Sequence, residues 1–301
     1  MIRRRQFLAG TASALVATQL TATQLAQAQP ARRDNKICVF TKPFQSLSYD
    51  QLAARIAELN CDGIEATIRD GGHIEPSQVP EELPKLVEAL RRRGLEITVM
   101  ASSINDPRDP LTESVLRTAS ALGIKRYRMK YFHYDLGQPI GRQLQNWKSI
   151  FADLAALNQT LGIGAVYQNH AGGRNLGASL LDLAEVLEGI PVDQIAVAYD
   201  IRHATVEGGM SWPVTFQMIR PHIDTVYVKD FVWGQGARPT NVPLGKGRVD
   251  RKFFKMLRDS QFEGPISLHE EYLDHRQPEL VPQHLEAIQR DLATLREWLK
   301  S

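Results

Sequence analysis

Short apolar runs rich in β-branched residues alternate with longer amphipathic runs along most of this chain. Apolar runs of roughly four to eight residues are typical of buried strands, and amphipathic runs are typical of the helices that cover them. Because strands that alternate with helices form parallel sheets, the pattern predicts an α/β fold. The strands are predicted at residues 37–40, 63–67, 95–100, 126–129, 165–167, 195–199, 225–228 and 266–268.

Eight strand–helix units are the number that closes a (β/α)8 barrel, so we predict a single-domain TIM barrel. Gly94, Gly123 and Gly162 each follow a helical run and precede a strand, as helix-ending glycines do. Long polar loops are expected in the strand-to-helix connections after the second, third and seventh strands. The helices are predicted at residues 48–59, 81–93, 111–122, 141–161, 178–187, 212–219, 251–260 and 279–299.

The first residues are predicted to be an export signal. Arg3-Arg4-Arg5 begins a twin-arginine pattern, an uncharged stretch follows, and Ala26-Gln27-Ala28 matches an A-x-A cleavage site. The threonines and glutamines of the stretch are too polar for a membrane-spanning helix. We expect residues 1–28 to be removed and residues 29–301 to form the barrel. The mature protein would then be periplasmic or otherwise exported, without a membrane anchor.

Charge and cysteine content narrow the possible partners. Residues 1–28 contain three arginines and no acid, so their removal lowers the lysine and arginine count from 36 to 33, against 34 acidic residues. A net charge near zero does not indicate nucleic acid as a partner. The sequence contains no Walker loop, so no nucleotide cofactor is expected. Cys38 and Cys61 are expected to be two reduced core thiols rather than one bridge. The sequence does not indicate an oligomeric state.

Polar and ionisable side chains follow the predicted strands at their C-terminal ends, where a (β/α)8 barrel places its chemistry. This arrangement indicates an enzyme-type site. The candidates, in chain order, are Gln168-Asn169-His170, Asp200 with His203, Lys229-Asp230, and His269 with Glu271.

Several short segments occur in an order that is typical of one group of barrels. They are DGIEATIR at 62–69, QNH at 168–170, YDIRHA at 199–204, VYVKD at 226–230, VPLGKGRVD at 242–250 and GPISLHEEY at 264–272. On these segments the chain resembles the xylose isomerase-like TIM-barrel superfamily, which includes sugar phosphate isomerases and sugar epimerases.

The resemblance raises the question of a metal. Related epimerases and isomerases hold a divalent cation with a Glu, an Asp, a His and a Glu on strands five to eight. These places correspond to Gln168, Asp200, Tyr227 and His269, of which only Asp200 keeps the family's residue type. One divalent cation (Mn, Co, Zn or Mg) and a hydrogen-bonded network without metal both stay open. Because His269 and Glu271 share a strand face, the candidate ligands are Asp200, His203, His269, Glu271 and Gln168.

The resemblance implies an isomerase or epimerase that removes a proton next to a sugar carbonyl. Because Gln168 cannot act as a base, His269 or Glu271 is predicted to take the proton, and Lys229 or a cation to stabilise the oxyanion. His203 is a further candidate for proton transfer. Substrate contacts are predicted for Gln168, Asn169, His170, Arg69, Arg128, Tyr167, Tyr227 and Trp233.

Two alternatives stay open at this stage. A lyase that acts on oxidised (keto) glycosides would share the first proton abstraction. A non-catalytic sugar-binding barrel is favoured by the replaced residues at positions 168, 227 and 269. All three hypotheses predict a small-molecule carbohydrate as the partner.

Overall fold

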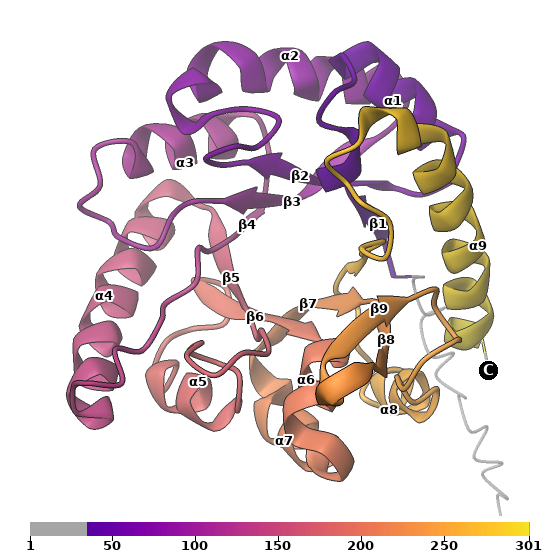
Figure 1. Cartoon of the computed structure of the whole chain (residues 1–301). Helices are drawn as coiled ribbons and strands as arrows, with labels where there is room; N and C mark the ends of the chain where they lie inside the picture. Colours follow the sequence, from indigo (N-terminus) through magenta and orange to yellow (C-terminus); the bar gives the residue numbers. More distant parts are fainter. Residues whose placement is uncertain (1–34, 301) are drawn as a thin grey trace, which may run out of the picture. The chain divides into compact units, whose positions relative to one another are not determined.

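Eight short parallel strands pair side by side and close into a barrel in the computed structural model, which describes residues 35–300 (Figure 1). The pairing order is β1-β10-β7-β6-β5-β4-β3-β2, with β2 paired again to β1. The predicted (β/α)8 barrel is therefore confirmed, and the predicted export signal lies outside the described residues. The barrel strands are β1 (Ile37–Phe40), β2 (Gly63–Ile68), β3 (Glu96–Ser102), β4 (Arg126–Arg128), β5 (Gly164–Gln168), β6 (Ile195–Asp200), β7 (Ile223–Val228) and β10 (Ile266–Leu268).

The helices surround the ring of strands (Figure 1). The structure contains all eight helices that the sequence pattern predicted. It also contains α6, which follows β6 directly and was not predicted. Helix α6 has only eight residues, and its first turn places Arg202 and His203 between the apolar Ile201 and Ala204, so the periodic signal was too short to recognise. The helices are α1 (Tyr49–Ala57), α2 (Val79–Arg91), α3 (Thr112–Ala121), α4 (Ile140–Leu161), α5 (Leu181–Val186), α6 (Ile201–Gly208), α7 (Trp212–Ile219), α8 (Lys252–Asp259) and α9 (Val281–Lys300).

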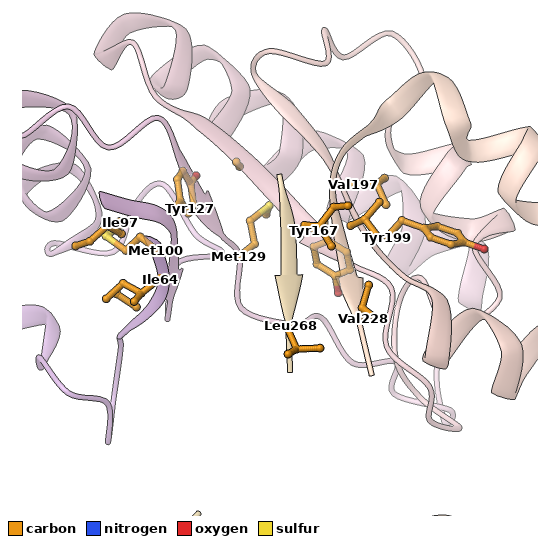
Figure 2. Close-up of a cluster of buried hydrophobic side chains, with 14 of the residues drawn as sticks. Ile64, Ile97, Met100, Tyr127, Met129, Tyr167, Val197, Tyr199, Val228 and Leu268 are labelled. Atoms are coloured by element: carbon orange, nitrogen blue, oxygen red, sulfur yellow. The ribbon is translucent and has the colours of Figure 1, made fainter. Parts of the chain in front are cut away.

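The apolar side chains form two layers. One cluster contains outward-facing strand residues, such as Ile64 and Tyr167 (Figure 2), and apolar residues of the surrounding helices. A smaller cluster, which includes Val166 and Tyr227, is built only from strand residues and fills the barrel interior. Because successive strand residues point to opposite sides, neighbours such as Val166 and Tyr167 belong to different layers. This alternation decides which strand-end side chains face the barrel axis.

The predicted helix ends are confirmed by backbone conformation. Gly94, Gly123 and Gly162 all have positive φ, which ends a helix at little cost only for glycine. At Gly162, φ of 66° and ψ of 34° close α4 two residues before β5 begins.

A β-hairpin occupies the region predicted as a polar loop after β7. Its strands are β8 (Asp230–Trp233) and β9 (Pro239–Val242), which pair antiparallel. The carboxylate of Asp230 then accepts the backbone N–H groups of Gly245, Gly247 and Val249 at 2.9–3.0 Å. These amides are therefore committed to Asp230, and the loop offers no free cradle for a phosphate.

Cys38 is buried, Cys61 is partly buried, and both are free cysteines in the structure. Within residues 35–300, no helix is long and apolar enough to cross a membrane.

Candidate active site

Asp200 ties the end of β6 to the start of α6. Its Oδ1 accepts the backbone N–H of His203 at 3.1 Å and so caps the helix. Asn169 fixes the strand end from the other side, because its amide bonds both the N–H of Asp200 at 2.7 Å and its carbonyl oxygen at 3.1 Å. With this backbone held, Oδ2 of Asp200 faces the other site residues.

Lys229 lies at the centre of the site. Its ammonium nitrogen is 3.2 Å from Oδ2 of Asp200 and 2.8 Å from Oε2 of Glu271. The Lys229 side chain is 5% exposed, and that of Glu271 is 24% exposed. Burial alone would raise the pKa of Glu271, but the Lys229 ammonium outweighs it and holds the pKa well below the usual value. Glu271 is therefore an open-facing carboxylate at neutral pH, and Lys229 is a buried cation between two anions.

Gln168 links this cluster to strands β4 and β5. Its amide nitrogen donates to Asp200 Oδ2 at 2.8 Å, while its oxygen accepts from Arg128 at 2.7 Å and from the Tyr131 hydroxyl. Both the nitrogen and the oxygen of the Gln168 amide thus have hydrogen-bond partners within the protein. Gln168 orders the site rather than presenting a free amide.

Glu65 was not predicted as a site residue. It lies on β2, faces the barrel interior, and accepts from His269 Nε2 at 2.7 Å and from Ser267 at 2.8 Å. Burial opposes ionisation of Glu65, but the charges of His269 and Arg128 lower its pKa to about 2. A carboxylate inside an otherwise apolar strand was the available signal, because such a group is costly to bury without partners.

His269 is shielded by this pairing. Its side chain is 1% exposed, and its ring stacks on Phe40 at 4.7 Å and lies 4.5 Å from the Tyr227 ring. His269 is therefore buried beneath the site, whereas the Glu271 side chain is partly exposed at the mouth of the barrel.

His170 and His203, the two other histidines predicted for the site, lie together with ring centroids 3.9 Å apart. Arg202 donates to Nδ1 of His203 at 3.0 Å, so Nε2 of a neutral His203 carries the proton and points towards Asp200 Oδ2 at 3.5 Å. His170 holds the carbonyl of Ala171 with Nδ1 at 2.9 Å, which leaves the lone pair on its Nε2. Burial and the Lys229 charge lower the pKa of His170 to about 4, so it is neutral near pH 7.

Glu270 and Glu271 point to opposite sides, as strand alternation predicted. The carboxylate of Glu270 accepts the N–H groups of Tyr272 and Leu273 at 3.0 and 2.9 Å and pairs with His284 on α9. Glu270 therefore belongs to the contact between barrel and helix, and only Glu271 belongs to the mouth.

Four predicted substrate contacts are placed away from the mouth. Tyr167 faces the helices, is fully buried, and accepts the N–H of Phe132 at 2.9 Å, because it precedes the inward-facing Gln168 (Figure 2). Trp233 lies on the β8–β9 hairpin, beside a separate hollow. Asn169 and Tyr227 are also fully buried. Asn169 bonds the backbone of Asp200, and Tyr227 fills the barrel interior.

A cavity of about 670 Å³ opens at the mouth beside this cluster. Arg69 and Arg128, both predicted substrate contacts, line it together with Tyr131 and Lys42. Lys229 and Glu271 are not among the residues that line the cavity. Its lining residues Arg128 and Tyr131 connect it to the cluster indirectly, because both bond to Gln168, which in turn donates to Asp200. The arrangement therefore joins a charged cluster to an open space of ligand size.

The donor set does not fit the family's divalent cation. The Lys229 ammonium already lies between Asp200 and Glu271, Gln168 turns its amide nitrogen rather than its oxygen to Asp200, and His269 is turned to Glu65. Among residues 35–300, no group of three or more His, Cys, Asp or Glu side chains is placed to hold a metal ion. Two carboxylates that already share one ammonium keep only a single net negative charge and have oxygens occupied by it, so they are poor ligands for a second cation.

A comparison with known protein families identifies the family to which the fold belongs. A family model described as a xylose isomerase-like TIM barrel matches residues 53–298. The chain therefore belongs to the xylose isomerase-like TIM-barrel family, and the predicted resemblance is confirmed. A search of curated proteins gave no match.

Solved structures share the fold at low identity. A putative xylose isomerase from Rhodospirillum rubrum is 15% identical with a TM-score of 0.68, over 86% of this chain and 99% of that one. The 3-keto-D-glucoside 4-epimerase YcjR from E. coli is 16% identical, with a TM-score of 0.64 over 88% and 100%. The probable 3-DHS dehydratase AsbF from Bacillus anthracis is 15% identical, with a TM-score of 0.66 over 87% and 98%. At these identities the likeness shows the fold alone.

Proposed function

We propose that this protein is an exported sugar isomerase or epimerase-like enzyme that removes a proton next to a sugar carbonyl. The observation that carries the proposal is the Lys229–Glu271 pair, a carboxylate and an ammonium in contact at the mouth of the barrel. An acid–base group beside a fixed positive charge is what enolisation requires. The fold family, in which solved members are named as sugar epimerases, supports the same class of reaction.

The roles follow from exposure. Glu271 takes the proton from the carbon next to the carbonyl with its outward oxygen, because Oε2 is held by Lys229. The C–H electron pair forms the enediolate double bond, and the carbonyl oxygen gains the negative charge, which Lys229 stabilises. Return of the proton to the former carbonyl carbon, together with transfer of the neighbouring hydroxyl proton to the former carbonyl oxygen, gives an isomer. Delivery of a proton from water to the other face of the first carbon gives an epimer. His203, through its Nε2–H, is placed to hold Asp200 or a substrate oxygen.

The reaction is tested by proton exchange with solvent. The protein is incubated in D₂O with a panel of aldoses, ketoses and 3-keto-glycosides, and the products are followed by NMR. We expect deuterium next to the carbonyl of recovered substrate and in an isomeric product. Release of an aglycone after exchange would instead support the keto-glycoside lyase, and binding without exchange would support a non-catalytic barrel.

Metal removal gives a second expected result. Because Lys229 occupies the space between Asp200 and Glu271, we expect the purified protein to contain little divalent metal by mass spectrometry. Its exchange activity and melting temperature should be unchanged after dialysis against EDTA. The matched variant is Asp200→Asn, whose metal content should equal that of the wild type. Near-stoichiometric metal that is lost together with activity, or lost in D200N, would contradict this role of Lys229.

Export is proposed from the sequence signals alone. The twin-arginine pattern and the A-x-A site at residues 26–28 support it.

A further inference from the structure

The cavity beside the Lys229–Glu271 pair is strongly basic. Five lysine or arginine residues line it, against one acidic residue, Asp70. The cationic side chains come from the segments after β1 and β2, from the end of β4 and the residues that follow it, and from the loop after β10. Four separate chain segments thus bring positive charge to one space.

Three of these five cations, Lys42, Arg69 and Lys130, have no carboxylate within residues 35–300 at ion-pair distance, and of the three only Lys42 and Arg69 are half-buried. By contrast, Arg128 lies 3.5 Å from Glu65, and Arg276 lies 2.9 Å from Asp274. The Arg69 guanidinium instead lies over the Phe40 ring, 5.7 Å from its centroid. Lys42 and Arg69 are therefore partly removed from water as well as unpaired.

The unpaired cations act on one another and on the catalytic pair. Burial lowers the pKa of Lys42; the nearby Glu271 raises it, and the charges of Arg69 and Lys229 lower it further. Burial and the charge of Arg128 likewise lower the pKa of Arg69. Half-buried cations that repel each other are stabilised by a bound anion. Because Glu271 and Lys229 both shift the pKa of Lys42, the basic cavity lies close enough to the Lys229–Glu271 pair for their charges to interact.

We propose that the substrate carries a carboxylate that binds between Lys42 and Arg69, which makes it a sugar acid rather than a neutral sugar. This inference rests on the proposed function, because it places the reacting carbonyl at Lys229 and Glu271 and the acid group in the basic cavity. The planar guanidinium of Arg69 matches a carboxylate with two parallel hydrogen bonds. A phosphate would also be attracted, but the glycine amides after β9 that would cradle one are bonded to Asp230.

The proposal is tested by calorimetric titration of the wild-type protein with two probes, D-gluconate and D-glucitol. They differ only in a carboxylate against a hydroxymethyl group. We expect gluconate to bind at least about tenfold more tightly, and its affinity to fall as salt is added. Arg69→Gln and Lys42→Gln should each weaken gluconate binding by about tenfold and leave glucitol binding unchanged. Lys255→Gln, at an exposed ion pair on α8, is the control and should change neither.

Each result decides the proposal. Equal binding of gluconate and glucitol, or no binding of gluconate, would overturn the anion site. Tighter binding of glucose 6-phosphate that R69Q weakens would keep the anion site and replace carboxylate by phosphate. Since titration does not need turnover, gluconate binding together with no solvent exchange into sugar acids that carry a carbonyl, such as D-glucuronate, would reject the proposed reaction and retain the site.

Discussion

Replacement of Lys229 by Met is expected to lower the free energy of unfolding by about 3–5 kcal/mol and to abolish solvent exchange into substrate. The variant leaves two carboxylates, Asp200 and Glu271, facing each other without the ammonium that lies 3.2 and 2.8 Å from them. It also removes the group that we propose stabilises the enediolate oxygen. Urea denaturation measures the first effect, and deuterium incorporation per folded protein measures the second.

Lys148→Met is the matched control. Lys148 also contacts two carboxylates, Glu185 at 3.5 Å and Glu188 at 3.8 Å, but its side chain is 29% exposed. Because water screens this pair, its loss should cost less than about 1 kcal/mol. Equal losses of stability in the two variants would contradict the central role of the buried ammonium.

The deficit of the Lys229→Met variant should also depend on pH. Without Lys229, one of the two carboxyl groups is expected to have a pKa above its unfolded value, because partial or full burial and the like charge both favour protonation. The folded variant then binds more protons than the unfolded chain, so its stability rises as pH falls. The difference from wild type should therefore be smaller at about pH 5 than at about pH 8, by the same linkage.

Replacement of Glu271 by Gln is expected to reduce the exchange rate by roughly 10³-fold while the protein stays folded. The amide cannot accept the proton, but it keeps the side-chain volume and a hydrogen bond to Lys229, which still pairs with Asp200. The readout is kcat for solvent exchange, with ligand affinity measured separately. A variant that lost affinity but kept kcat would show that Glu271 binds substrate without acting as the base.

The neighbouring residue supplies the control for that variant. Glu270→Gln should weaken the buried contacts to Tyr272, Leu273 and His284 and lower stability by about 1–3 kcal/mol. Its exchange rate per folded protein should stay at the wild-type value. The two adjacent acids thus have opposite expected effects because their side chains point to opposite sides of the strand end.

Most of the fold could be predicted because its signals are local. The apolar runs located all eight barrel strands, and Gly94, Gly123 and Gly162 ended helices as expected. The failures were local too. Helix α6 has only eight residues and carries Arg202 and His203 in its first turn, and the β8–β9 hairpin lies in a segment whose composition is typical of a loop.

The site was predicted as a neighbourhood but not as a set of contacts. Strand-end positions correctly brought Asp200, Lys229 and Glu271 together at the barrel mouth. They did not distinguish inward from outward neighbours, so Tyr167 was misplaced as a substrate contact. They also missed Lys42, since it follows β1 without any motif.

By itself, the sequence determined which residues end each strand, because hydrophobic period and turn residues act over a few positions. Only the tertiary structure decided which partners those residues meet. Glu65 bonds His269 across a separation of 204 residues, and Lys229 rather than a metal lies between Asp200 and Glu271. Such pairings depend on the closure and stagger of the barrel, which bring side chains of different strands together, and no local pattern in the chain encodes that geometry.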